Sequence, residues 1–179
     1  MQHVNVEVKA TCADPEAVRQ VLRRHGADFR GTDRQVDTYF PVPAGRLKLR
    51  EGNIENRLIY YERGDQPGPR RADVLLLDTA PGSPIKDILT RALGVRVVVD
   101  KRREIYFIDN VKFHIDVVEG LGSFVEIEAQ SAPDETAPDL PERLGAQCRA
   151  WMDELALRPE DLLTPSYSDM LVQPRGQPE

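Results

Sequence analysis

The sequence has very few of the residues from which disulfides, zinc sites and thiol active centres are built. Only two cysteines occur among its 179 residues, and Cys12 and Cys148 lie far apart in the chain. The three histidines, His3, His25 and His114, show no metal-ligand spacing such as His-x-x-x-His. We therefore expect free thiols in a reducing, cytoplasmic compartment, and neither a zinc site nor a Cys/His catalytic pair.

Long apolar runs and an excess of positive charge are missing as well. No run approaches the roughly 20 apolar residues of a membrane helix, and we expect no signal peptide because the N-terminal stretch has neither a basic nor an apolar region. Lysine and arginine number 24 against 30 aspartates and glutamates, for a formal net charge of −6. We therefore expect neither nucleic acid nor a membrane as a partner, and an anionic ligand would need a local cluster of basic residues.

What is present is a regular alternation of apolar and polar residues, which is the pattern of a strand with two different faces. In residues 4–10, for example, valines and polar residues take turns. The pattern predicts eight strands, at residues 4–10, 36–40, 46–50, 57–63, 71–78, 97–108, 111–117 and 123–130. No repeat and no linker divides the chain, so we expect one domain over residues 1–172 and a disordered tail over 173–179.

Four helical segments are predicted from capping residues and apolar stripes. Asp14 and Pro15 suit the N-cap and the first residue of a helix, and Gly26 suits its end. The other three are expected from Ser83-Pro84 to about Gly94, over about 140–157, and over 166–172.

The polar positions of the strands are almost all ionisable, and they sort by sign. The carboxylates are Glu7, Asp116, Glu126 and Glu128, and the cations are Lys9, Lys48, Arg50, Lys101 and Arg103. Like charges that adjoin on a sheet repel each other, so these rows need a compensating ligand. An open sheet with one solvated face is the alternative interpretation. We predict an α+β fold, a closed eight-stranded antiparallel β-barrel with charged rows inside and helices packed outside.

Several motifs follow one another in a fixed order along the strands. They are Asn5-x-Glu7-x-Lys9, the segments 47–56 and 58–63, Lys101-x-Arg103, and the segment 114–128, which ends in Phe-Val-Glu-Ile-Glu. In this order and at these spacings they resemble the CYTH superfamily, the triphosphate tunnel metalloenzymes, which includes class IV adenylate cyclases and thiamine triphosphatases. The resemblance covers residues 3–130 and the stretch 166–171.

Two positions depart from the family's pattern. Asn5 stands where the first motif has a carboxylate, so we expect weaker binding of a divalent metal than the pattern provides. Residues 70–74 read Arg-Arg-Ala-Asp-Val, where the family often has Lys-x-Ser-x-Tyr. This second change keeps the charge and loses the hydroxyls.

The resemblance implies that a triphosphate binds inside the barrel together with Mg²⁺ or Mn²⁺. Lysine and arginine side chains suit phosphate oxygens, and carboxylates suit these hard cations. The expected triphosphate-binding residues are Lys9, Lys48, Arg50, Arg63, Arg70, Lys101, Arg103 and Tyr167, and the expected metal-binding residues are Glu7, Asp116, Glu126 and Glu128. Lys9 is also the candidate catalytic base, with phosphate anchoring as the alternative, and Tyr167 either closes one end of the tunnel or packs a C-terminal helix.

The activity expected first is that of a class IV adenylate cyclase, which converts ATP to cyclic AMP and pyrophosphate. Hydrolysis of inorganic, thiamine or nucleoside triphosphate is the alternative. A third interpretation is a non-catalytic binder of polyphosphate or nucleotide, which Asn5 and the altered 70–74 segment favour. No base-recognition pocket is visible in the sequence, and a homodimer is left open.

Overall fold

The structure is a computed structural model that describes residues 2–63, 69–133 and 135–172. Eight strands, four α-helices and one short 3₁₀ helix form within these residues. In chain order they are β1 (Gln2–Thr11), α1 (Pro15–Arg24), β2 (Asp28–Phe40), β3 (Arg46–Glu51), β4 (Arg57–Arg63), β5 (Arg70–Asp78), α2 (Ile85–Leu93), β6 (Val97–Ile108), β7 (Val111–Val118), β8 (Gly122–Gln130), α3 (Leu140–Glu154), η1 (Pro159–Asp161) and α4 (Tyr167–Val172). The predicted tail, 173–179, lies outside the described residues.

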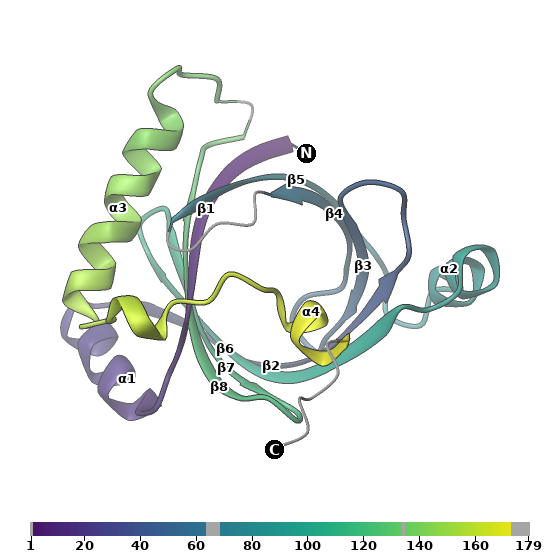
Figure 1. Ribbon diagram of the computed structural model, residues 1–179, viewed down its shortest axis with the longest axis horizontal. Helices are drawn as coiled ribbons and strands as arrows, with labels where there is room; N and C mark the ends of the chain where they lie inside the picture. The colour runs from purple at the N-terminus through teal and green to yellow at the C-terminus, as the bar shows by residue number, and fades with distance from the viewer. Residues whose placement is uncertain (1, 64–68, 134, 173–179) are drawn as a thin grey trace, which may run out of the picture.

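All strand pairs are antiparallel, in the order β1-β5-β4-β3-β2-β6-β7-β8, and the pairing of β1 with β8 closes the sheet into a barrel. Figure 1 shows this ring of strands with α1 and α3 on one side of it. The predicted eight antiparallel strands and the α+β class are confirmed. One boundary was wrong: β2 begins at Asp28 rather than at residue 36. Its first half has no apolar alternation, but it pairs with β6 from Asp28 onward, with a bulge between Phe29 and Gly31.

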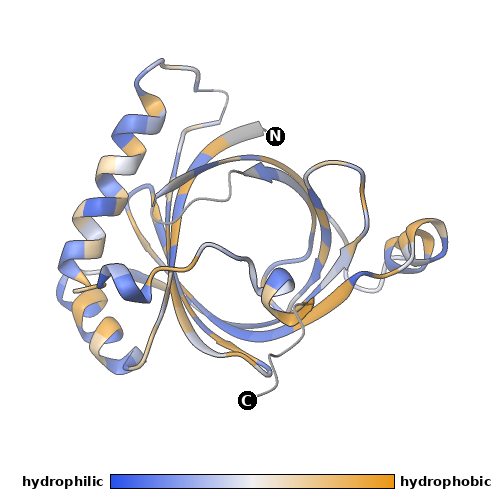
Figure 2. Cartoon of the chain, viewed as in Figure 1, coloured by the Kyte–Doolittle hydropathy of each residue, from blue (hydrophilic) through white to orange (hydrophobic). Residues whose placement is uncertain are grey.

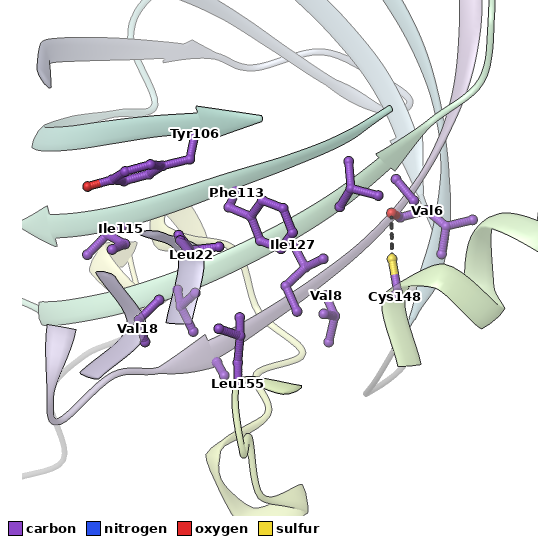
Figure 3. Packing of buried hydrophobic residues seen from close by; sticks show 14 of the residues in the cluster. Val6, Val8, Val18, Leu22, Tyr106, Phe113, Ile115, Ile127, Cys148 and Leu155 are labelled. Atoms are coloured by element: carbon purple, nitrogen blue, oxygen red, sulfur yellow. Dashed lines mark hydrogen bonds between the residues drawn. The ribbon is translucent and has the colours of Figure 1, made fainter. Parts of the chain in front are cut away.

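The main hydrophobic core lies outside the barrel, between strands β1, β7 and β8 and helices α1 and α3. The first strand contributes Val6 and Val8, and Figure 3 shows how these side chains face the helices. In Figure 2 hydrophobic and hydrophilic residues alternate along the strands, because neighbouring residues of a strand point to opposite faces. Cys12 and Cys148 are both buried free thiols, and the Cys148 thiol donates to the Val6 carbonyl at 3.1 Å.

Helix α1 begins as its sequence predicts. The Asp14 side chain accepts hydrogen bonds from the backbone N–H groups of Glu16 and Ala17, both at 3.1 Å, and Pro15 occupies the first turn. The helix buries Val18 and Leu22 in the core. Such a cap contributes about 1 kcal/mol to stability.

The last helix differs from the others in its place. Helix α4 packs Tyr167 against Tyr39, Val99 and Phe124, residues of β2, β6 and β8, and lies over one opening of the ring in Figure 1. The predicted packing of helices outside the barrel thus describes α1 and α3, whereas α4 lies at an end. No helix among the described residues has the length and apolar character needed to span a membrane.

Candidate functional site: a charged barrel interior

The barrel encloses a cavity of about 130 Å³ to which all eight strands contribute side chains. A single water molecule needs at least about 10–15 Å³ measured in this way, so the space suits a ligand of several polar groups. The predicted residues that line the cavity are Glu7, Lys9, Lys48, Arg50, Lys101, Arg103, Glu126, Glu128 and Tyr167. The side chains of Arg63 and Arg70 lie outside the described part of the structure.

A first cluster gathers three cations around one acid. Asp37 is fully buried on β2, directly across from Arg50 on β3. Its carboxylate accepts from Arg50 at 2.9 and 3.0 Å, from Lys48 at 3.0 Å and from Lys101 at 2.6 Å. Burial raises the pKa of Asp37, but Arg50, Lys101 and Lys48 hold it well below its usual value. We refer to these four residues as the Asp37 cluster.

Arg50 also contacts Glu55, which pairs with Lys112 as well, so two carboxylates are shared by four cations and positive charge is left over. The effect is visible at Lys101, which is 2% exposed. Burial lowers the pKa of Lys101 to about 7, and Arg50, Arg103 and Lys48 act in the same direction, against the attraction of Asp37. An anion that entered the cavity would relieve this excess of positive charge.

This arrangement predicts a pH-dependent affinity for oligophosphate. A bound phosphate favours the charged Lys101, so binding takes up a proton and weakens as the pH rises above about 7. The folding stability of the free protein has the opposite pH dependence. The pKa of Lys101 is about 7 in the folded protein and 10.5 in an exposed lysine, so between these pH values the unfolded chain binds more protons and the free energy of unfolding rises with pH. Titration calorimetry with tripolyphosphate across this range, on the wild type and on Lys101→Met, measures the slope. An equal slope in both proteins would contradict the role of Lys101.

A second cluster is centred on Arg103 and lies toward α4. Arg103 faces Asp116 across β6 and β7 and donates to its two oxygens at 2.7 and 2.5 Å. It also donates to Glu126 at 2.7 Å. Asp116 is completely buried behind this contact and does not line the cavity. Its role as a metal ligand stays a prediction. Burial raises the pKa of Asp116, and Arg103 more than offsets this.

Glu126 connects the second cluster to the first strand. Lys9 lies across from Glu126 in the β1–β8 register, and the Lys9 ammonium is 2.9 Å from its carboxylate. His114 Nδ1 lies 3.1 Å from the same carboxylate, while the buried Nε2 has no hydrogen-bond partner among the described residues. Burial lowers the pKa of His114, which favours the neutral ring.

Tyr167 covers this cluster from the C-terminal helix. Its hydroxyl donates to Asp116 at 2.8 Å, and the Lys9 ammonium lies 3.6 Å from the centre of its ring. Burial raises the pKa of Tyr167, as do the nearby acids Asp116 and Glu126, so the phenol keeps its proton. Tyr167 thus packs α4 on the barrel and at the same time lies over the Arg103 end of the cavity, so helix packing and end closure do not exclude each other. The ion pair with Glu126 suits Lys9 as an anchor for an anion, and its assignment as a base stays a prediction.

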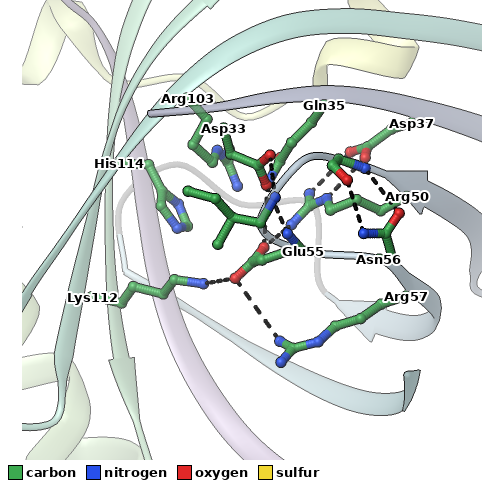
Figure 4. Close-up of polar contacts among 12 residues, drawn as sticks. Asp33, Gln35, Asp37, Arg50, Glu55, Asn56, Arg57, Arg103, Lys112 and His114 are labelled. Carbon is green, nitrogen blue, oxygen red and sulfur yellow. Dashed lines mark hydrogen bonds and ion pairs between the residues drawn. The ribbon is translucent and has the colours of Figure 1, made fainter. Parts of the chain in front are cut away.

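A third cluster is held by the loop between β3 and β4 (Figure 4). Asp33 accepts from the backbone N–H groups of Ile54 and Glu55 at 2.9 and 3.0 Å. A Cβ at Gly52 would lie 2.7 Å from both Asp33 carboxylate oxygens, so this close approach requires glycine. The loop thereby directs Glu55 to Lys112, at 2.6 Å, and Arg50, at 2.9 Å. Burial raises the pKa of Glu55, and these cations lower it far more.

Several residues of the interior were missed by sequence reasoning. They are Asp33, Gln35, Asp37 and Glu55, whereas Lys112 and His114 lie in the predicted polar row of strand 111–117 and were only left out of the expected site residues. In residues 33–37 the polar residues do alternate, but Arg34 and Val36 between them do not form an apolar row, so the pattern was hidden. Glu55 lies in a loop, where no periodicity exists to reveal it.

The carboxylates that best fit a divalent metal are Glu7 and Glu128. They lie across from each other in the β1–β8 register and both line the cavity. The hydrogen bonds to Glu128 come from neutral amides, Asn5 at 2.5 Å and Gln130 at 2.9 Å, whereas Glu126 is paired with cations. No group of three or more potential ligands is gathered among the described residues. Mg²⁺ commonly takes only one or two carboxylates and completes its shell with phosphate and water, so this donor set fits.

The fold and this interior together define a class: a closed antiparallel barrel whose charged cavity suits a small polyanion. A family model described as the CYTH domain matches residues 3–167, so the chain belongs to the CYTH family. The resemblance seen in the motifs is thereby confirmed. No curated protein matches the chain.

Solved structures with the same fold include proteins from archaea, bacteria and plants. The PH1012 protein from Pyrococcus horikoshii OT3 is 26% identical with a TM-score of 0.78, over 92% of this chain and 98% of that one. A proposed adenylate cyclase from Vibrio parahaemolyticus is 18% identical with a TM-score of 0.73, over 94% and 98%. A proposed adenylyl cyclase from Hippeastrum, described as having a dominant triphosphatase activity, is 13% identical with a TM-score of 0.56, over 95% and 94%.

Proposed function

We propose that this protein is a divalent-metal-dependent enzyme that binds a triphosphate in the barrel cavity and acts on it there. The Asp37 cluster carries the proposal, because three buried or nearly buried cations that share one carboxylate attract a polyanion. The whole chain has a net charge of −6, so this attraction is local to the interior. Phosphoryl transfer depends mainly on positioning and charge stabilisation, which such a cavity supplies.

The reaction proposed first is the cyclisation of ATP. The ribose 3′-oxygen bonds to the α-phosphorus, the bond from that phosphorus to the bridging oxygen breaks, the hydroxyl proton is lost, and pyrophosphate leaves. The second is hydrolysis, in which water attacks the terminal phosphorus and orthophosphate leaves. The Vibrio protein's description favours the first reaction and that of the Hippeastrum protein the second.

The charged residues of the cavity divide three tasks in this proposal. Lys48, Arg50 and Lys101 hold phosphate oxygens, and Arg103 and Lys9 extend this surface toward α4. Glu7 and Glu128 would hold Mg²⁺ or Mn²⁺, which when bound neutralises phosphate charge and activates the nucleophile. The neutral His114 has the chemistry to accept the nucleophile's proton, whereas Lys9, whose ammonium pairs with Glu126, would have to lose its own proton before it could act as the base.

A non-catalytic binder of polyphosphate or nucleotide is the second candidate. Asn5 favours it, because an amide in place of a carboxylate leaves less negative charge for a metal. Incubation with ATP, tripolyphosphate or thiamine triphosphate, each with Mg²⁺ or Mn²⁺, separates the two when cyclic AMP and phosphate are assayed independently. Binding of a triphosphate without formation of either product would support the non-catalytic binder. Absence of binding would overturn both the enzyme and the binder.

Arg50→Ala is expected to weaken tripolyphosphate binding by about 1.5–3 kcal/mol, the usual contribution of charge-assisted hydrogen bonds. Arg50 is 6% exposed and lines the cavity. Arg71→Ala is the matched control, because Arg71 is an exposed arginine that pairs with Asp73. Calorimetric titration of both variants measures the difference, and equal affinity in the two would remove Arg50 from the site.

A further inference from the structure

The outer surface of the barrel is covered by packed helices on one side only. Helices α1 and α3 lie against β1, β7 and β8, whereas α2 stands away from the ring on the opposite side (Figure 1). Ten large apolar residues are well exposed in the described part of the chain, and six of them lie in the stretch from β5 through α2 to the start of β6. They are Leu75, Leu77, Ile88, Leu93, Val95 and Val98. Apolar residues that gather in this way indicate a surface that binds another molecule.

The register between strands joins the two ends of this stretch into one face. A row of residues that lie directly across from one another runs over the outside of β5, β4, β3, β2 and β6, and consists of Leu77, Leu58, Leu49, Thr38 and Val98. The middle of the row is buried, and α2 contacts β2. The ends are open, with Leu77 58% and Val98 47% exposed. We call this row and α2 together the α2 face.

Helix α2 has an apolar stripe that it does not bury. It is nine residues long and includes Ile85, Ile88, Leu89 and Leu93, yet none of its residues, all of which the structure describes, is buried. Ile88 is 59% exposed. Helices shorter than about 12–15 residues are marginal by themselves, and most gain their stability when an apolar stripe packs on another surface. A contact that buried Ile88 would therefore stabilise the helix as well as the complex.

The charges of α2 indicate which molecule fits this face. Asp87 and Arg91 are exposed, lie four residues apart and so share one side of the helix. Neither forms an ion pair with another described residue, whereas the neighbouring Lys86 pairs with Glu51 at 2.6 Å. Leu89 is midway between the two charges and is also the middle residue of α2. An antiparallel second copy of α2, related by a two-fold axis at the level of Leu89, therefore brings each Asp87 to the Arg91 of the other copy.

We propose that the α2 face binds a second copy of this chain in a two-fold contact, with α2 of one copy antiparallel to α2 of the other. The two Ile88 side chains bury each other near the axis, and two Asp87–Arg91 ion pairs flank them. This contact is separate from the cavity, because the residues of a strand alternate between its faces. Leu58 on β4, for example, faces outward next to Arg57, which lines the cavity, so dimerisation does not depend on a triphosphate.

Sedimentation velocity of the full chain over a series of micromolar concentrations is expected to show a monomer–dimer equilibrium. Asp87→Arg and Arg91→Asp each place like charges opposite one another in a homodimer, so each should weaken dimerisation at least about 10-fold. An equimolar mixture of the two variants should restore it, because the opposed charges then differ in sign. The double variant Asp87→Arg/Arg91→Asp exchanges the charges within one chain and should dimerise as the wild type does.

Ile88→Asp examines the apolar part of the contact and should also weaken dimerisation at least about 10-fold, as the loss of a central interface residue commonly does. Val117→Asp is the matched control, since Val117 is 39% exposed on β7, outside the α2 face, and should leave dimerisation unchanged. Circular dichroism checks that each variant is folded. A wild-type chain that stays monomeric at every concentration overturns the proposal. So does a mixture of the two charge variants that dimerises no better than either variant alone, or a loss in Val117→Asp equal to that in Ile88→Asp.

Discussion

Arg103→Ala is expected to lower the free energy of unfolding by about 3–5 kcal/mol, because removing one partner of a buried ion pair leaves the other charge uncompensated. Asp116 is completely buried and Glu126 largely so, and Arg103 donates to both. The same change is expected to weaken tripolyphosphate binding beyond detection at millimolar ligand. Urea denaturation at pH 7 and calorimetric titration measure the two effects.

Two further variants make this prediction specific. Arg102→Ala removes a neighbouring but exposed arginine and should change stability by less than about 0.5 kcal/mol. Adding Asp116→Asn to Arg103→Ala removes one uncompensated charge, and should restore part of the lost stability without restoring binding. A single Arg103→Ala variant as stable as Arg102→Ala would show that the Arg103–Asp116 pair does not hold this end of the barrel together.

Glu128→Gln is expected to reduce both Mn²⁺ affinity and metal-dependent turnover by roughly 100-fold, the upper range for changes around a metal site. The variant keeps the shape of the side chain and its contacts with neutral amides, while removing the charge that a hard cation needs. A Mn²⁺ titration followed by electron paramagnetic resonance measures affinity without substrate.

Two comparisons show which carboxylate the metal uses. Glu126→Gln should lower turnover with a smaller change in Mn²⁺ affinity, because Glu126 holds Lys9 and Arg103 in place. Glu142→Gln changes an exposed acid on α3 and should change neither quantity. If Glu128→Gln binds Mn²⁺ as the wild type does, the pair of Glu7 and Glu128 is not the metal site.

Much of the barrel could be predicted because its strands face two different environments. In β1 and β8 apolar residues pack on helices and ionisable residues face the cavity, so period-two alternation is strong and the strand limits follow from it. The first half of β2 has no such contrast. It is a strand because it pairs with β6 over its whole length, and pairing between segments distant in sequence leaves no local signal.

The site was predicted in the same uneven way. Lys9, Arg50, Arg103 and Glu126 were found because each lies in an alternating row. Which cation pairs with which acid depends on the register between strands, which a single strand's sequence does not contain. Asp37 was overlooked because residues 33–37 show no apolar row, and its contacts with three of the predicted cations follow only from this register.

Asp37 and Glu55 act as internal counterions, which an entering anion would displace from the cations of the cavity. Both acids belong to the chain and both contact Arg50, so the cations of the cavity have counterions before any ligand arrives. The barrel can then fold without ligand, with its basic side chains already held in place and little conformational entropy left to lose on binding. An entering phosphate would compete with a carboxylate for Arg50. The measured affinity would then reflect the difference between the free energies of the Arg50–phosphate and Arg50–carboxylate contacts, and not the whole free energy of the phosphate contact.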